Sequence, residues 1–249
     1  MTADADGSWV ALFSGGKDSS WALYRALETG LSVSHLLTVH PSADSYMYHV
    51  PETGLARLAA DAVGIDHVEV TADDLDATEV TDAGAQGDRE LAPLERALRG
   101  LVADREVAGV TAGAVESEYQ TSRIEALCDR LGLDLFAPLY GEDPERLGRA
   151  IVDAGFEVRV VAVAAAGLDE SWLWRRLDDA ALDDLLALRD QYGVHPLGEG
   201  GEFETVVVAG PHMDGRIDVD HETEWDGRRG RVHVTDARLV YSDGASTRE

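Results

Sequence analysis

Short apolar runs alternate with amphipathic segments through the first 140 residues of this chain. The runs at 9–12, 33–40, 67–70, 107–112 and 133–137 have the length and composition of buried strands. Between them, the segments 21–27, 53–63, 89–102 and 120–131 carry apolar residues at helical spacing. The acidic, glycine-containing stretch 71–87 predicts a solvent-exposed loop. This alternation predicts an α/β fold with a parallel, doubly wound sheet that binds ligands at the carboxyl ends of its strands.

The pattern changes in the second half of the chain. Asp143 followed by Pro144 is typical of a helix start, and we place the domain boundary just before it, giving domains 1–138 and 139–249. A continuous apolar run at 158–166 and a helical segment at 178–192 are followed by alternating runs at 203–209, 216–223 and 231–241. These segments predict a smaller α+β domain that ends in β structure.

The stretch Ser14-Gly15-Gly16-Lys17-Asp18-Ser19 joins the first strand to the first helix. A glycine turn at a helix N-terminus presents backbone N–H groups and the positive end of the helix dipole to an anion. The lysine adds a full charge, and the two serines add hydroxyl donors. We therefore interpret the stretch as a phosphate-binding loop; the alternative is a glycine turn that only connects strand to helix.

Two further stretches carry candidate chemistry. Residues 113–123 follow the strand 107–112 and lead into a helix, so they lie where a doubly wound sheet contacts ligands, although an ordinary capped helix start would look the same. Residues 198–205 place three carboxylates and three glycines together, which suits a cationic ligand such as Mg²⁺, ammonium or a quaternary amine. In a very acidic protein the same stretch could be a plain acidic turn. Near residue 46, two tyrosines could contact adenine or a methylated ammonium group.

Charge is the unusual feature of the composition. The chain of 249 residues has 48 acidic and 21 basic residues, a net charge of −27, and Lys17 is its only lysine. The acids are spread along the whole chain, which favours adaptation to molar salt over a docking face for a basic partner. The acid excess also argues against nucleic-acid binding.

The sequence shows no recognisable targeting signal and contains one cysteine. No apolar run approaches about 18 residues, so we expect no membrane span, and the acidic N-terminus lacks the features of a signal peptide. The single cysteine, Cys128, lies on the apolar side of its helix and is predicted to be a core residue. We expect a cytoplasmic protein.

Together these residues resemble the diphthine–ammonia ligase family, a branch of the PP-loop ATP-pyrophosphatase superfamily. The resemblance rests on the loop at 14–19, Ser45-Tyr46-Met47-Tyr48-His49, residues 113–123, Gly167-Leu168-Asp169-Glu170 with Trp172-Leu173, and residues 199–205. It covers nearly the whole chain. Tyr140 stands where the family pattern has tryptophan, and Trp174 stands where glycine is usual.

The resemblance implies a fold of the adenine nucleotide alpha hydrolase type and a defined reaction. ATP would adenylate the carboxylate of diphthine, a modified histidine of a translation elongation factor. Pyrophosphate would leave, and free ammonium would supply the nitrogen that gives diphthamide and AMP. No glutaminase segment is recognisable in the sequence.

The resemblance also implies site residues. Lys17, Asp18 and Ser19 would be catalytic, with Asp18 a candidate Mg²⁺ ligand; ATP would bind Ser14, Gly15, Gly16, Lys17, Asp18, Ser19 and Arg123. Substrate contacts would come from Ser45, Met47, His49, Glu116, Ser117, Tyr119, Gln120, Glu199, Gly200, Gly201, Glu202, Phe203, Glu204 and Thr205. The alternatives are another PP-loop ligase, such as a tRNA-modifying enzyme, and a non-catalytic nucleotide-binding protein.

Overall fold

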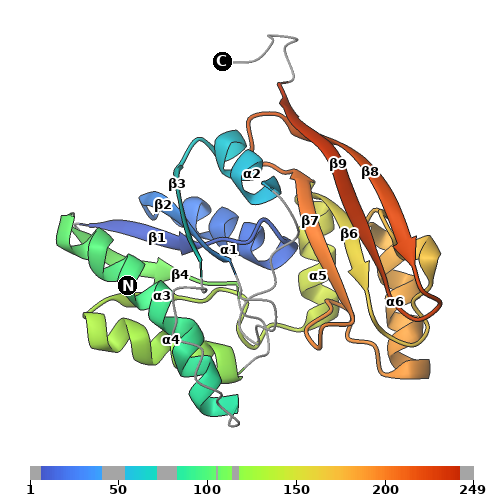
Figure 1. The fold of residues 1–249 in the computed structure, drawn as a ribbon, viewed down its shortest axis with the longest axis horizontal. Helices are drawn as coiled ribbons and strands as arrows, with labels where there is room; N and C mark the ends of the chain where they lie inside the picture. Colours follow the sequence, from blue (N-terminus) through green and yellow to red (C-terminus); the bar gives the residue numbers. More distant parts are fainter. Residues whose placement is uncertain (1–6, 41–53, 72–82, 105, 114–117, 242–249) are drawn as a thin grey trace.

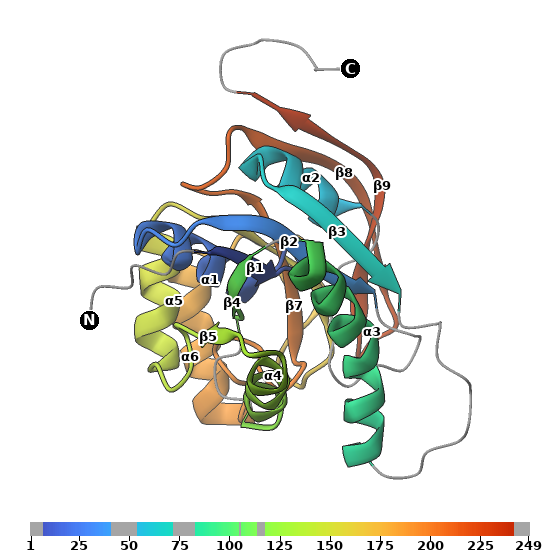
Figure 2. The same ribbon diagram turned by 90° about the vertical axis from the view of Figure 1, so that its left-hand side faces the viewer.

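The computed structural model describes residues 7–40, 54–71, 83–104, 106–113 and 118–241, with the backbone alone for 83–90, 104 and 118–120. Its first half is built on a five-stranded parallel sheet. The strands are β1 (Ser8–Leu12), β2 (Val33–His40), β3 (Asp66–Thr71), β4 (Val107–Thr111) and β5 (Asp134–Phe136). Their order is β3-β2-β1-β4-β5, so the direction of winding reverses between β1 and β4 (Figure 2). This topology confirms the predicted doubly wound sheet, and it places the ligand crevice beside the end of β1.

Helices cover both faces of this sheet because its strands alternate apolar side chains between the faces. Val10 of β1 packs with the core beneath α3 (Ala83–Asp104) and α4 (Glu118–Leu131). Its neighbour Ala11 packs on the opposite side, with α1 (Lys17–Glu28) and α2 (Leu55–Val63). Period-two alternation along a doubly covered strand requires this division.

The second half forms a four-stranded antiparallel sheet with two helices. It consists of α5 (Pro144–Asp153), β6 (Glu157–Val163), a 3₁₀ turn η2 (Glu170–Trp172), α6 (Asp179–Tyr192), β7 (Phe203–Ala209), β8 (Arg216–Trp225) and β9 (Gly230–Val240). The strand order is β7-β6-β9-β8, which leaves β7 and β8 at the edges. The side chains of Asp143 and Asp178 accept N–H bonds at the starts of α5 and α6, as N-caps do.

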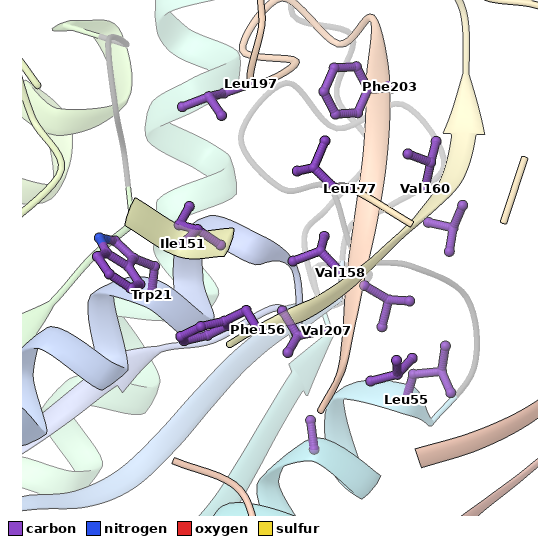
Figure 3. Close-up of a cluster of buried hydrophobic side chains, with 14 of the residues drawn as sticks. Trp21, Leu55, Ile151, Phe156, Val158, Val160, Leu177, Leu197, Phe203 and Val207 are labelled. Atoms are coloured by element: carbon purple, nitrogen blue, oxygen red, sulfur yellow. The ribbon is translucent and has the colours of Figure 1, made fainter. Parts of the chain in front are cut away.

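The two halves share one continuous hydrophobic core. In Figure 1 the two sheets lie on opposite sides of the molecule with α1 between them, and α1 and α2 contribute side chains to the core of the second sheet. Trp21 of α1 meets Phe156 edge-on at 5.5 Å between ring centroids, and both lie beside Ile151 (Figure 3). The ring of His212 stacks on Phe156 with the centroids 5.1 Å apart, and burial lowers the pKa of His212 to about 4. The helix that follows the glycine loop is thus fixed by both halves.

Most predicted elements agree with the structure, with three differences. The predicted loop 71–87 was wrong at both ends, because Thr71 is the last residue of β3 and residues 83–87 already belong to α3; residues 72–82 lie outside the described part of the chain. The turn η2 was not predicted. Trp174 has φ 61°, in the left-handed region, and is the only described residue other than glycine with positive φ. The glycine expected at this position by family resemblance would adopt that conformation at lower cost.

Candidate active site

The glycine loop lies where β1 ends and α1 begins, at the edge of the sheet where ligands bind in this topology. Its two serines hold it in shape. The Ser14 N–H donates to Ser19 Oγ (3.2 Å), and Ser19 Oγ donates to the carbonyl of Gly16 (3.2 Å). The two hydroxyl oxygens lie 3.1 Å apart. The hydroxyls predicted to contact phosphate thus also fold the loop around the place a ligand would take.

Glycine is required at two points around this loop. Gly15 has φ 76°, and a Cβ there would lie 3.3 Å from the backbone of Ala56 in α2. A Cβ on Gly113, which follows β4, would lie 2.6–2.7 Å from backbone atoms of Asp18 and Ser19. The connection after β4 therefore passes directly over the first turn of α1, as predicted for a ligand-binding crevice.

Lys17 and Asp18 open α1 as an ion pair in which Lys17 is buried and Asp18 is partly exposed. Lys17 Nζ lies 2.7 Å from Asp18 Oδ2, and only 3% of Lys17 is exposed. Asp18 Oδ1 is buried and has no hydrogen-bond partner among the described residues. An acceptor left in this state costs free energy unless a ligand, a cation or water satisfies it. Asp18 therefore has, within the described part of the chain, one carboxylate oxygen that remains to be satisfied at the first turn of α1.

The outer edge of β7 touches the loop. Lys17 N–H donates to Thr205 Oγ1 (3.2 Å), and Val207 N–H donates to the carbonyl of Gly15 (2.9 Å). The Phe203 ring centroid lies 5.8 Å from Lys17 Nζ. The structure thus brings Phe203 and Thr205, predicted as substrate contacts, against the loop predicted to hold ATP.

The acidic segment before β7 folds on itself. Glu202 accepts N–H bonds from His195 (3.1 Å) and Gly200 (2.8 Å). The Nδ1 atom of His195 accepts from the N–H groups of Leu197 (3.1 Å) and Glu199 (3.3 Å), so the neutral ring carries its proton on Nε2. The Glu202 carboxylate therefore satisfies backbone donors of its own turn.

Three polar groups near the strand ends were not among the predicted site residues. Thr38 Oγ1 donates to the carbonyl of Phe13 (2.5 Å), the residue before the loop, and accepts from Nε2 of His67 (2.7 Å). Burial of His67 lowers its pKa. Thr111, at the end of β4, is buried and its hydroxyl has no partner within the described residues. Of the three, only Thr111 ends its strand and could have been found as a polar residue that closes an apolar run; Thr38 lies inside β2 and His67 near the start of β3.

The remaining predicted site residues are placed only in part. Ser45, Met47, His49, Glu116 and Ser117 lie outside the described residues. Tyr119 and Gln120 begin α4, of which only the backbone is described there, and Arg123 is half-buried on the same helix. Cys128 is buried in the core, as predicted, and burial raises the pKa of its thiol to about 11.

Comparison with known proteins identifies the family. The family model of the diphthamide synthase N-terminal domain matches residues 7–135, and that of the diphthamide synthase C-terminal domain matches residues 143–240. This chain belongs to the diphthamide synthase family.

Individual relatives agree with this assignment. The chain is 33% identical to the diphthine–ammonia ligase of Homo sapiens and 31% identical to that of Danio rerio. The human alignment covers 85% of this chain and 82% of the relative, and the zebrafish alignment covers 85% and 86%. Among solved structures, a predicted tRNA methyltransferase subunit from Methanocaldococcus jannaschii covers 82% of this chain and 98% of its own, with 21% identity and a TM-score of 0.45. A likeness of that size carries no functional information.

The regions matched by the two family models meet at the glycine loop. Lys17 and Gly15 belong to the N-terminal match, and their partners Thr205 and Val207 belong to the C-terminal match. Within the described ranges, no group of three or more His, Cys, Asp or Glu side chains could hold a metal ion, and no helix is both long and apolar enough to cross a bilayer.

Proposed function

We propose that this chain catalyses the ATP-dependent amidation of diphthine to diphthamide on a translation elongation factor, with ammonium as the nitrogen source. The relatives named diphthine–ammonia ligase, aligned over both halves of the chain, support the reaction. The observation that carries the proposal is the glycine loop at the end of β1, which leads into the N-terminus of α1 with Lys17 buried in the first turn.

The proposed reaction has two covalent steps. A carboxylate oxygen of diphthine attacks the α-phosphorus of ATP, the bond to the β-phosphate bridging oxygen breaks, and pyrophosphate leaves. Ammonia, formed when ammonium loses a proton, then attacks the acyl carbon. The carbon–oxygen bond to AMP breaks, the nitrogen loses a second proton, and diphthamide and AMP result.

The loop would contribute by stabilising the charge on the departing pyrophosphate. Lys17 supplies a positive charge, the serine hydroxyls and loop N–H groups supply donors, and Arg123 on α4 is proposed to reach a phosphate. Ser14 and Ser19 already hold the loop in shape through their mutual contacts, so little reorganisation is needed when ATP binds. Preorganised donors of this kind are the largest electrostatic contribution in many enzymes.

Asp18 fits the role of a Mg²⁺ ligand, because Oδ1 is buried and unsatisfied among the described residues. Mg²⁺ usually binds one or two carboxylates together with substrate phosphates and water, so the lack of a larger ligand cluster in the described residues is consistent with it. When bound, Mg²⁺ would neutralise part of the phosphate charge. Asp18 would hold it at the first turn of α1, next to Lys17.

The substrate side would be formed by 45–49, 116–120 and the acidic segment 199–205. Diphthine carries a trimethylammonium group, and Glu199 and Glu204 would provide negative charge for it. Replacing both by glutamine is expected to raise KM for the elongation factor severalfold with no change in KM for ATP. Glu222→Gln on β8, an exposed site away from the loop, is the control; equal KM values in all three proteins would refute this contact.

We further propose that residues 1–138 act as the ATP-binding domain and 139–249 as the substrate-binding domain. The partners would be ATP, ammonium and the elongation factor, in the cytoplasm, where the factor works in translation. The acid excess of the chain supports a protein substrate over nucleic acid.

The deciding experiment is an assay of the purified protein in high salt with ATP, ammonium and diphthine-bearing elongation factor, following AMP and pyrophosphate. AMP formation should require all three substrates, and Lys17→Ala should abolish it while far-UV circular dichroism stays unchanged. Release of ADP would refute the proposal, and AMP formation by Lys17→Ala at the normal rate would remove the loop from the mechanism. ATP binding without turnover would indicate a nucleotide sensor instead.

A further inference from the structure

The start of α1 lacks a cap of its own. Gly16 is the N-cap residue of this helix and makes no side-chain cap hydrogen bond. The N–H groups of a first helical turn have no partner within the helix, and a side chain, water or ligand must satisfy them. Here the N–H of Lys17, the first helical residue, donates to Thr205 Oγ1, a hydroxyl 188 positions further along the chain.

The same strand holds the loop at a second point. Val207 N–H donates to the Gly15 carbonyl, on the edge of β7 that faces away from β6. A Cβ on Gly16 would lie 3.2 Å from the Thr205 carbonyl oxygen, so the loop and the strand are in close contact. Thr205 is buried, with 6% of its surface exposed. Contact with bulk water therefore does not compete for the Lys17 N–H.

The segment before β7 fixes where Thr205 stands. Glu202 lies three residues before Thr205, and its carboxylate accepts hydrogen bonds from the backbone N–H groups of His195 and Gly200. In the other direction, Thr205 and Val207 are in register with Val160 and Val158 of β6. The hydroxyl is thus placed by the pairing of β7 with β6 and by the turn that precedes β7.

We propose that Thr205 is a positioning residue of the phosphate loop, which orients the Gly16–Lys17 peptide by accepting the Lys17 N–H. This assignment rests on the proposed role of the loop in holding the phosphates of ATP. It differs from a contact to diphthine, the role that family resemblance gave this residue. The second half of the chain then contributes directly to the ATP site, because its edge strand caps the helix on which that site is built.

The test compares Thr205→Val, which keeps the shape and removes the acceptor, with Thr205→Ser, which keeps the hydroxyl. In the full-length protein, Thr205→Val is expected to lower kcat/KM for ATP about tenfold or more, the loss typical of one hydrogen bond in a preorganised site. KM for the elongation factor should stay within about twofold, and Thr205→Ser should restore most of the activity. Thr223→Val, at an exposed threonine of β8, is the matched control.

Amide hydrogen exchange at Lys17 gives a readout that does not depend on turnover. Exchange should be faster in Thr205→Val than in the unmodified protein and Thr205→Ser, while amides of β1 remain equally protected. Should Thr205→Val fold poorly, Gly16→Ala tests the same contact from the loop side, because its Cβ would press on the Thr205 carbonyl. It is expected to lower the affinity for ATP in the same way.

The outcomes separate the two proposals. Unchanged ATP kinetics and Lys17 exchange in Thr205→Val, with Lys17→Ala inactive, would overturn the positioning role and leave the ligase proposal standing. A rise confined to KM for the elongation factor would make Thr205 a substrate contact. If Lys17→Ala remained fully active, the proposed role of the loop in catalysis would fail, and Lys17 exchange alone would decide whether Thr205 positions the loop.

Discussion

The backbone at Trp174, in the second half of the molecule, is strained, and substitutions at this position can measure that strain. Its φ of 61° lies where an L-residue pays a steric cost that glycine does not. The position is nevertheless well supported. Its N–H donates to the Val160 carbonyl (2.7 Å), and its ring lies 4.4 Å from that of His221. These tertiary contacts thus hold the Trp174 backbone in a conformation that is sterically unfavourable for an L-residue.

Comparing glycine with alanine at this position isolates the backbone contribution, since both substitutions remove the ring. The left-handed conformation costs an L-residue about 1–2 kcal/mol. Glycine loses about 0.5–1 kcal/mol more than alanine through chain entropy. Trp174→Gly should therefore be more stable than Trp174→Ala by about 1 kcal/mol. At Arg176, an exposed position two residues away without positive φ, the order should reverse, with glycine less stable by about 0.5–1 kcal/mol.

Urea unfolding of the four variants at one fixed salt concentration measures these differences. The two variants at each site should have equal m-values, so that differences in midpoint report stability. If the alanine variant were more stable than the glycine variant at both Trp174 and Arg176, the idea that the Trp174 backbone is strained would be refuted. AMP formation by Trp174→Gly would further show whether the indole itself matters for substrate choice.

Two other predictions concern the loop and the shared core. Gly15→Ala should fold but bind ATP at least about tenfold more weakly, because its Cβ would press on Ala56 and its φ would be strained. The control is Gly30→Ala, at a glycine with φ 84° and open space around it, which should lose stability but keep its affinity for ATP. Titration calorimetry measures both affinities. His212 has a lowered pKa, so its neutral form is favoured in the folded state, and stability should fall as the pH drops from about 6.5 through about 4. His212→Phe should lose less stability over that range, by up to about 3 kcal/mol, in urea titrations at each pH; equal pH slopes would contradict the assignment.

The sheet was predictable because its strands and helices are marked locally. Buried parallel strands are short apolar runs, and the glycine after 63 and after 131 marks the end of a helix in the sequence and in the structure. The start of α3 was not predictable from these signals. Residues 83–87 are small, polar and rich in glycine, so they lack helical periodicity, yet they extend a helix whose later turns are packed. Packing at Leu94 and Leu98 stabilises the helix, and the first turns follow by propagation.

The sequence indicated which residues form the site better than it indicated which of them contact one another. The loop at 14–19 could be recognised because strand, glycine turn and helix are consecutive in sequence. The contact of Thr205 with Lys17 could not, because it depends on how the second sheet packs against α1. Similarly, Glu202 is one of several acidic residues in its segment, and only the folded turn shows that its carboxylate accepts hydrogen bonds from backbone N–H groups.

The placement of Lys17 also determines how this protein responds to amine chemistry. As the only lysine in the chain, and a buried one paired with Asp18, it leaves the described surface without a single lysine ammonium group. Acylating reagents, and enzymes that acetylate or ubiquitinate lysines, have one side chain to modify, and that side chain is shielded by the loop it serves. The rate at which it can be labelled would therefore report how often the loop opens.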